Sequence, residues 1–388
     1  MSENDAHSTD ERRAAGDHSL GRCLLTGATG EIGSYCVRKL NRMGVRPTVV
    51  LRRPLAEEAW QGAQVDIVEA DLAMIAASPR GLRECPASAE LPPSAAESDQ
   101  RARTQREALA SALARADTVF HLAARVNLAG RGREHMEQLN LRGTIALFDL
   151  ACQTKVKRFL HVSTTGAVGC AATPEALNEE AHYNLEKFRN PYFVTKRLAE
   201  ETILAHWRES DRATDLVVVN PPIVMGPQGS FRRTSRPRRR PLPRPGSFWL
   251  RCLRFWWPGG LNIVDVRDVS EGILLAAARG AAGRRYILGG DNVSVRELME
   301  RAHEILGTGR PSIRMPIPLL KAAARGTRVW EALGGGRSRF TPSFARLLGY
   351  YWYYDSTRAR TELGYASRPL EETLRDVREW WEREASGT

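Results

Sequence analysis

The sequence predicts a protein of the α/β class, built on a doubly wound parallel sheet with a smaller C-terminal substrate lobe. Apolar runs rich in Val, Leu and Ile alternate with helical patterns along most of the chain. Such continuous runs are typical of parallel strands that helices cover on both faces. A glycine-rich turn, Gly27–Gly33, follows the first of these runs directly.

Each element is predicted from its apolar periodicity and its boundary residues. In chain order, we expect strands at 22–26, 47–53, 64–72, 117–124, 156–165 and 214–222, with helices that include 34–43, 135–153 and 192–209. Further along, we expect strands at 261–269 and 285–290, and helices at 270–279, 294–306 and 369–384.

The predicted elements divide the chain into a tail and two parts. Residues 1–20 are polar and are expected to be a disordered tail. Residues 21–222 are expected to form the first domain, which carries the doubly wound sheet. It is interrupted near 73–104 by a segment rich in Ala, Ser, Pro and charge, which we expect to be a mobile insertion. Residues 223–388 form the substrate lobe, from which 261–290 is expected to return to the core of the first domain.

Composition excludes several classes of protein. The 388 residues are 42% hydrophobic and 26% charged, which is ordinary for a globular chain. The sequence has no run of eighteen apolar residues and no apolar secretory segment at its N-terminus, so we expect a cytoplasmic protein. Six scattered cysteines without a Cys-x-x-Cys pair argue against zinc, and we expect no metal site and reduced thiols.

The net charge of +12 is concentrated in one segment. Residues 231–254 contain nine arginines and no acid, which leaves 12 − 9 = +3 for the rest of the chain. The segment could contact an anionic membrane surface through 231–257, with Phe248, Trp249, Phe255, Trp256 and Trp257 at the interface. It could instead be a loop that closes over an anionic or apolar substrate. Nucleic-acid binding through 231–254 is disfavoured, because no recognised nucleic-acid fold accompanies it.

The glycine-rich turn predicts a dinucleotide site. Between a strand and a helix the backbone must turn sharply and approach a ligand closely, and glycine permits both. The free N–H groups at the helix start then favour a pyrophosphate. The next strand ends in Arg52 and Arg53, which favours NADP over NAD because guanidinium groups suit a 2′-phosphate, unless both are solvated surface charges. Asp71 could accept a hydrogen bond from the adenine amino group.

The pattern "YFVTK" predicts an acid–base pair. On a helix, Tyr192 and Lys196 lie on one face, and the ammonium would lower the pKa of the phenol from its ordinary value of about 10. The fifth strand ends in Ser163, Thr164 and Thr165, any of which could hydrogen-bond a substrate oxygen at the sheet edge where such folds bind ligands.

The chain resembles the extended short-chain dehydrogenase/reductase family, also called NAD-dependent epimerase/dehydratases. Five runs carry the resemblance when taken together: "TGATGEIG", "HLAA", "STTGAVG", "YFVTK" and "NPPIVMGP". The resemblance runs from about Gly21 to Trp381. The later runs "RYILGGDNVSVRELME" and "YYWYYDSTRARTELGYASRPLEETL" look most like the branch of dihydroflavonol reductases and hopanoid-associated sugar epimerases.

The resemblance assigns roles to individual residues. It implies that Thr164, Tyr192, Lys196 and Asn140 are catalytic, with Asn140 beside the active site and Thr164 selected by its distance from Gly169. It implies a cofactor site made of Gly27, Thr29, Gly30, Glu31, Ile32, Gly33, Arg52, Asp71, Leu72, Ala123, Ala124, Tyr192, Lys196, Pro222 and Ile223.

The expected function is that of an NAD(P)-dependent oxidoreductase that transfers a hydride at a carbinol or carbonyl carbon of a small or lipid-like substrate. A sugar or sugar-nucleotide epimerase and a non-catalytic dinucleotide sensor or scaffold are the alternatives. The resemblance disfavours a 4,6-dehydratase, because Thr165 and Gly166 stand where those enzymes have an Asp-Glu pair. The family often forms dimers, so a homodimer is expected from the resemblance alone.

Overall fold

The computed structural model describes residues 20–77, 93–227, 254–334, 336–338 and 340–386. Its largest sheet has seven parallel strands in the order β11-β7-β5-β4-β1-β2-β3. These are β1 (Cys23–Thr26), β2 (Thr48–Leu51), β3 (Asp66–Glu69), β4 (Thr118–His121), β5 (Arg158–Val162), β7 (Asp215–Asn220) and β11 (Arg285–Ile287). The doubly wound parallel sheet predicted from the apolar runs is confirmed.

The strand order places a cleft at one point of this sheet. From β1 the chain moves outward through β2 and β3, and then returns to build β4, β5, β7 and β11 on the other side. The order therefore reverses between β1 and β4, where the connections at the carboxyl ends diverge. Open α/β sheets bind their ligands in the crevice at such a point.

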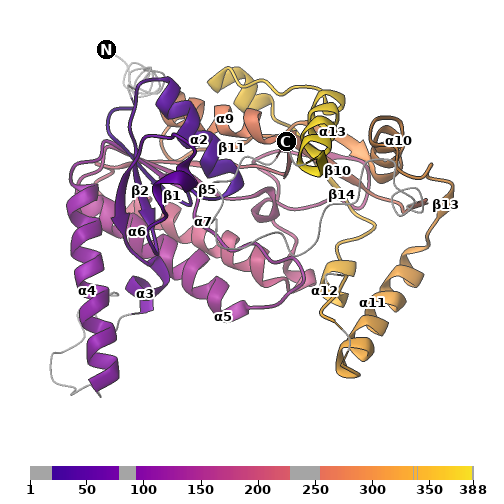
Figure 1. Ribbon diagram of the computed structural model, residues 1–388, viewed down its shortest axis with the longest axis horizontal. Coiled ribbons are helices and arrows are strands. Elements are labelled where there is room, and N and C mark those ends of the chain that lie inside the picture. The colour runs from indigo at the N-terminus through magenta and orange to yellow at the C-terminus, as the bar shows by residue number, and fades with distance from the viewer. Residues whose placement is uncertain (1–19, 78–92, 228–253, 335, 339, 387–388) are drawn as a thin grey trace, which may run out of the picture.

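Helices cover both faces of the sheet (Figure 1). On one face, α2 (Glu31–Arg42) packs against α9 (Val266–Arg279), and their apolar side chains share a core with β1 and β2. On the other face lie α3 (Leu72–Ala77), α4 (Pro93–Leu113), α6 (Gly143–Gln153) and α7 (Pro191–Glu209). The short α5 (Arg133–Met136) continues through a π-helical stretch, Glu137–Arg142, into α6.

A second, smaller sheet is built mostly from residues after 222, with β6 contributed by the part of the chain before them. Its order is β12-β10-β14-β6, with β8 beside β10. The strands are β6 (Ala176–Leu177), β8 (Ile223–Met225), β10 (Gly260–Asp265), β12 (Asp291–Ser294) and β14 (Tyr351–Tyr354).

The expected return of 261–290 to the first domain needs a correction. The helix α9 and the strand β11 do lie on the seven-stranded sheet, but β10 pairs with β8, β12 and β14 in the second sheet. The apolar run 261–269, expected to be one strand, is a strand as far as Asp265 and a helix from Val266. The change occurs there because the Asp265 carboxylate accepts from the Arg267 N–H and caps α9.

The remaining elements complete the lobe. They are β9 (Phe255–Trp256), which pairs with β13 (Ile313–Arg314), and the helices α10 (Val295–Leu306), α11 (Ile317–Ala332), α12 (Pro342–Ala345) and α13 (Leu370–Ser386). In Figure 1, α11 extends away from the body of the molecule. Across the described ranges, every helix is too short or too polar to cross a lipid bilayer.

The segment 73–104 also differs from the prediction of an unpacked insertion. Its two ends belong to α3 and α4, and Ala102, Gln105 and Leu109 of α4 are buried at helical spacing against the sheet layer. The Ala-, Ser- and Pro-rich composition concealed this stripe, because only a few of its side chains reach the core. Residues 78–92, the tail 1–19 and the basic stretch 228–253 lie outside the described residues.

Candidate functional site

The glycine-rich turn closes tightly on the sheet and leaves a helix end open. Gly27 has a φ of +73°, and a Cβ there would lie 2.7 Å from the backbone N of Ala123. A Cβ at Gly33 would overlap the carbonyl oxygen of Gly27. Gly30 precedes α2 without any side-chain cap, so the first N–H groups of the helix can bind an anion. This cradle fits the pyrophosphate of a dinucleotide.

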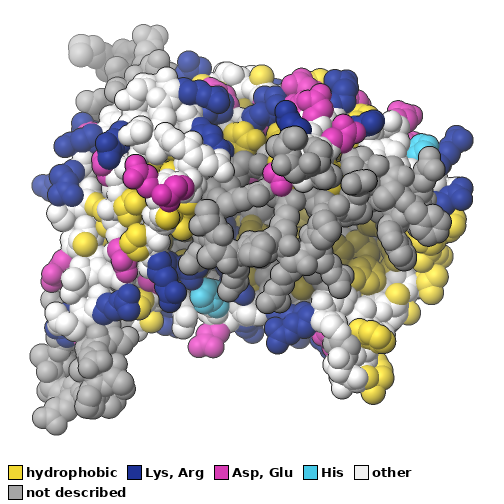
Figure 2. Space-filling model, viewed as in Figure 1, with side chains coloured by type: hydrophobic (Ala, Val, Ile, Leu, Met, Phe, Trp, Pro, Cys, Tyr) yellow, Lys and Arg dark blue, Asp and Glu magenta, His cyan; other side chains and the backbone are white. Residues whose placement is uncertain are grey.

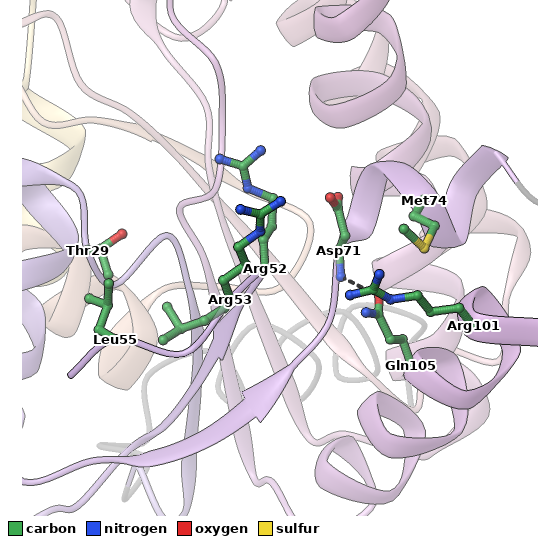
Figure 3. Close-up of a pocket in the computed structure, with 9 residues that line it drawn as sticks. Thr29, Arg52, Arg53, Leu55, Asp71, Met74, Arg101 and Gln105 are labelled. Carbon is green, nitrogen blue, oxygen red and sulfur yellow. Dashed lines mark hydrogen bonds between the residues drawn. The ribbon is translucent and has the colours of Figure 1, made fainter. Parts of the chain in front are cut away.

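A basic pocket of about 380 Å³ lies beside this turn (Figure 3). Arg52 and Arg53 reach it from the end of β2. Asp71 reaches it from the link between β3 and α3, and Thr29 from the turn. The pocket places the predicted phosphate-binding and adenine-binding side chains together. Leu72 is buried instead and does not line it.

Five further lining residues were not foreseen from the sequence: Leu51, Leu55, Met74, Arg101 and Gln105. Arg101 and Gln105 approach from α4, opposite Arg52 and Arg53 (Figure 3), and the Gln105 side chain accepts from the Asp71 N–H at 2.9 Å. The pocket thus has three guanidinium groups. Arg101 was missed because it lies in the segment expected to be an unpacked insertion.

A larger cavity of about 560 Å³ lies between the two sheets. The predicted residues that line it are Glu31, Ile32, Ala124, Thr164, Tyr192, Lys196, Pro222 and Ile223. Ala123 does not line the cavity, and its N–H donates to Thr26 Oγ1 at 3.1 Å. The opposite wall is apolar and aromatic: Trp257, Phe344, Leu347, Leu348, Tyr350 and Trp352.

Tyr192 stands at the start of α7, inside the cavity. The Asn190 side chain caps the helix by accepting from the Tyr192 N–H at 3.0 Å, and Pro191 occupies the first helical position. Burial raises the pKa of Tyr192 to about 12, although a hydrogen bond with the Thr164 side chain opposes this rise. The sequence predicted the opposite direction. The phenol is therefore protonated at neutral pH in this structure.

Lys196 lies one turn further along α7 and is fully enclosed. Its Nζ donates to the Val162 carbonyl oxygen at 2.7 Å and lies 3.3 Å from His161 Nε2. Burial lowers the pKa of the Lys196 ammonium to about 8, while the nearby Glu200 carboxylate acts in the other direction. Because the ammonium is directed at Val162 and His161, it does not lower the pKa of the Tyr192 phenol. Burial therefore determines that pKa.

Two buried histidines support this lysine. The rings of His121 and His161 are stacked with centroids 5.4 Å apart. Burial, and then the charge of Lys196, lowers the pKa of His121 to about 3 and that of His161 well below its ordinary range. Both rings are neutral, so Lys196 is the one cation of this cluster. The family pattern did not signal His161.

Of the three strand-end hydroxyl groups, Thr164 is the one that contacts the phenol. Its Oγ1 also accepts from the Gly166 N–H at 3.2 Å, and its carbonyl accepts from Asn220 Nδ2 at 3.0 Å. Ser163 and Thr165 line the cavity as well.

Asn140 is fully buried behind the cavity and does not line it. Its side chain accepts from the Arg125 N–H at 2.8 Å and donates to the Arg125 carbonyl at 3.0 Å. It also donates to Thr195 Oγ1 at 3.4 Å. The structure therefore gives Asn140 a positioning role between the 125 loop and α7, and not the catalytic contact that was expected.

The family model of the NAD dependent epimerase/dehydratase family matches residues 23–289. The chain belongs to this family. The matched region holds the glycine turn, both arginines at the end of β2 and the Thr164, Tyr192 and Lys196 cluster. Members of the family are NAD(P)-dependent reductases, dehydrogenases or epimerases, and this chain is an enzyme of that kind.

Two curated relatives match nearly the whole chain at 27% identity. One is the putative dihydroflavonol 4-reductase of Synechocystis sp., aligned over 92% of this chain and 94% of its own length. The other is the sterol demethylase protein B of Methylococcus capsulatus, over 92% and 97%.

Solved structures share the fold. The crystal structure of gox2253 is similar with a TM-score of 0.68 and 26% identity, over 93% of this chain and 98% of that one. The UDP-glucose 4-epimerase of Thermotoga maritima, determined with UDP-glucose, has a TM-score of 0.62 at 20% identity, over 93% and 99%. At that identity the likeness extends to the fold alone.

Proposed function

We propose that the protein is an NADP-preferring reductase or dehydrogenase of an apolar carbonyl or carbinol compound. The observation that carries the proposal is the cavity itself. One end holds a protonated phenol, a hydroxyl and a buried amine, and the rest of its described wall is almost entirely hydrophobic.

The preference for NADP rests on the basic pocket. Arg52, Arg53 and Arg101 surround it, and Asp71 is the single acid among the lining residues that the structure describes. A 2′-phosphate adds about two negative charges and three acceptor oxygens, which guanidinium groups bind better than they bind a ribose hydroxyl. An NAD site of this fold instead has an acid near the end of the second strand.

The catalytic roles follow from the protonation states. When bound, the nicotinamide supplies or accepts the hydride. The Tyr192 phenol carries its proton at neutral pH and donates it to the substrate oxygen during reduction. Thr164 orients that oxygen through its hydroxyl. Lys196, on the same face of α7, holds the ribose with its buried ammonium, which binds a polar group more strongly there than it would in water.

The lining favours an apolar substrate over an anionic one. Among the described lining residues, Lys196 is the sole cation and Glu31 the sole acid, and none of them is an arginine that could bind a diphosphate. The aromatic wall instead offers surface for a ring system or an acyl chain. The names of the two relatives that match most of the chain, a dihydroflavonol reductase and a sterol demethylase protein, agree with a ring-bearing, poorly soluble substrate.

The test is a substrate panel followed through NADPH absorbance. We expect turnover with sterol-like or flavonoid-like ketones, and a kcat/KM with NADPH at least ten times that with NADH. If NADPH is consumed rapidly with simple aliphatic and cyclic ketones but not with sterol-like or flavonoid-like ketones, the substrate is a small ketone. Conversion of UDP-glucose without net change in NADPH, combined with no reaction of any ketone, would contradict the proposal and favour the epimerase.

A further inference from the structure

The helix α11 presents an uncovered apolar face to solvent. Leu319, Val329 and Trp330 are 53%, 61% and 63% exposed, and Leu333, just past the helix end, is 81% exposed. Figure 2 shows hydrophobic side chains gathered at the lower right, where Figure 1 places α11. Large apolar side chains exposed in such numbers on one helix mark an interaction surface more often than chance.

These side chains form one stripe. At 100° per residue, Leu319, Ala322, Ala323, Trp330 and Leu333 fall on the same side of the helix, and each is exposed. We call these five residues and Val329 the α11 stripe. Gly326 lies in its middle, so the stripe holds no polar side chain.

The opposite side fixes α11 to the protein. Ala324 is fully buried, and Thr327 Oγ1 donates to the Phe340 carbonyl at 3.0 Å. Arg131 Nη2 donates to Glu331 Oε2 at 2.6 Å. These contacts hold the inner face of α11 against the protein, so the stripe keeps a fixed orientation. None of the described residues covers it.

The charge around the stripe identifies the partner. At 100° per residue, Arg325 lies about 40° from Val329 at the border of the stripe, and Lys321 and Arg328 lie further round the same flank of α11. Between Gly307 and Gly349 the sequence has eight Lys or Arg residues and a single acid, Glu331, whose carboxylate is paired with Arg131. An apolar stripe with a tryptophan, bordered by cations and free of acids, is complementary to a bilayer with anionic headgroups.

The inner face of α11, opposite the stripe, adjoins the substrate cavity. Ile317 and Ala324 of α11 pack in one cluster with Phe344 and Leu348, which line the cavity wall. An apolar substrate dissolved in a membrane would therefore lie close to the site when α11 rests on that membrane. We propose that α11 docks the enzyme on an anionic lipid surface, with Leu319, Trp330 and Leu333 in the interface and Lys321, Arg325 and Arg328 on the headgroups.

The experiment is vesicle flotation with the full chain. One set of vesicles contains equal parts of phosphatidylglycerol and phosphatidylcholine, and the other contains phosphatidylcholine alone. We expect the wild type to float with the anionic vesicles and to bind them less in high salt. Leu319→Ser with Trp330→Ser should lower the partition constant by about tenfold or more, since two large apolar side chains leave the interface.

Three further variants separate charge from apolar contact. Arg325→Glu with Arg328→Glu should reduce flotation on anionic vesicles. Arg42→Glu with Arg115→Glu, which changes the net charge equally on other exposed surfaces, should reduce it far less. Met43→Ser is the matched apolar control, because Met43 is 59% exposed on another face. Circular dichroism and turnover of a water-soluble ketone should be unchanged in all of them.

Three results would overturn the proposal. The wild type could fail to float with anionic vesicles, or the Leu319→Ser, Trp330→Ser variant could float as the wild type does, so that another part of the chain accounts for binding. Sedimentation velocity without lipid could show a dimer that this variant dissociates, in which case the stripe is an interface between two copies of the chain.

Discussion

Because the ammonium of Lys196 is buried, we expect the free energy of unfolding, as well as the activity, to depend on pH. Burial lowers the pKa of this group from its ordinary value of 10.5 to about 8. The unfolded chain therefore binds the proton more tightly than the folded chain between those two pH values. By linkage, the free energy of unfolding must rise as the pH increases from about 8 to 10.5.

The magnitude follows from the same two values. The difference between 10.5 and about 8 corresponds to about 3 kcal/mol of destabilisation, fully present below pH 8 and absent above 10.5. Lys196→Met removes this penalty, but it also removes the hydrogen bond to the Val162 carbonyl, which costs about 2 kcal/mol at every pH. We expect the variant to be about 1 kcal/mol more stable than the wild type at pH 7 and about 2 kcal/mol less stable at pH 10.5.

The assay is urea unfolding of both proteins at several pH values from 7 to 10.5. The difference between the two curves isolates Lys196, because every other group of the chain titrates in both proteins. Activity should be lost in Lys196→Met throughout. A stability difference that stays constant with pH, or one that moves in favour of the variant as the pH rises, would refute the reasoning.

Three other outcomes follow from the same site. Gly33→Ala forces the turn apart, since its Cβ would overlap the Gly27 carbonyl oxygen, and fluorescence titration should show NADPH binding at least about tenfold weaker. Arg101→Ser should raise the Kd for NADPH several-fold and leave that for NADH nearly unchanged; equal losses would show that Arg101 does not contact the 2′-phosphate. The rate of ketone reduction should fall as the pH rises through about 8, because Lys196 then loses its charge; a flat profile to pH 10 would contradict that role.

The sheet was predictable because its signals are local. Each buried strand is an apolar run of ordinary strand length, and the turn Gly27–Gly33 follows the first of them. The two pockets at the sheet edge were predictable for the same reason: parallel strands end at one edge, and Thr164 after β5 and Arg52 after β2 line the pockets there.

What the sequence did not reveal depends on tertiary contacts. Arg101 reaches the basic pocket because a sparse stripe around Leu109 packs α4 on the sheet, and composition alone does not distinguish this from an unpacked insertion. His161 lies in an apolar strand, so only the path of Lys196 makes it part of the site. The pKa of Tyr192 rises because burial outweighs its neighbours, which helical spacing cannot show.

The central claim is that the Tyr192 phenol supplies the proton at this cavity. Tyr192→Phe removes one oxygen and leaves the ring that packs beside Phe193. The direct measurement is single-turnover reduction of a ketone by NADPH in the wild type and this variant, with the Kd for NADPH measured in parallel. The account predicts a loss of about a hundredfold or more in rate with an unchanged Kd. A variant that reduces the ketone at the wild-type rate would contradict it.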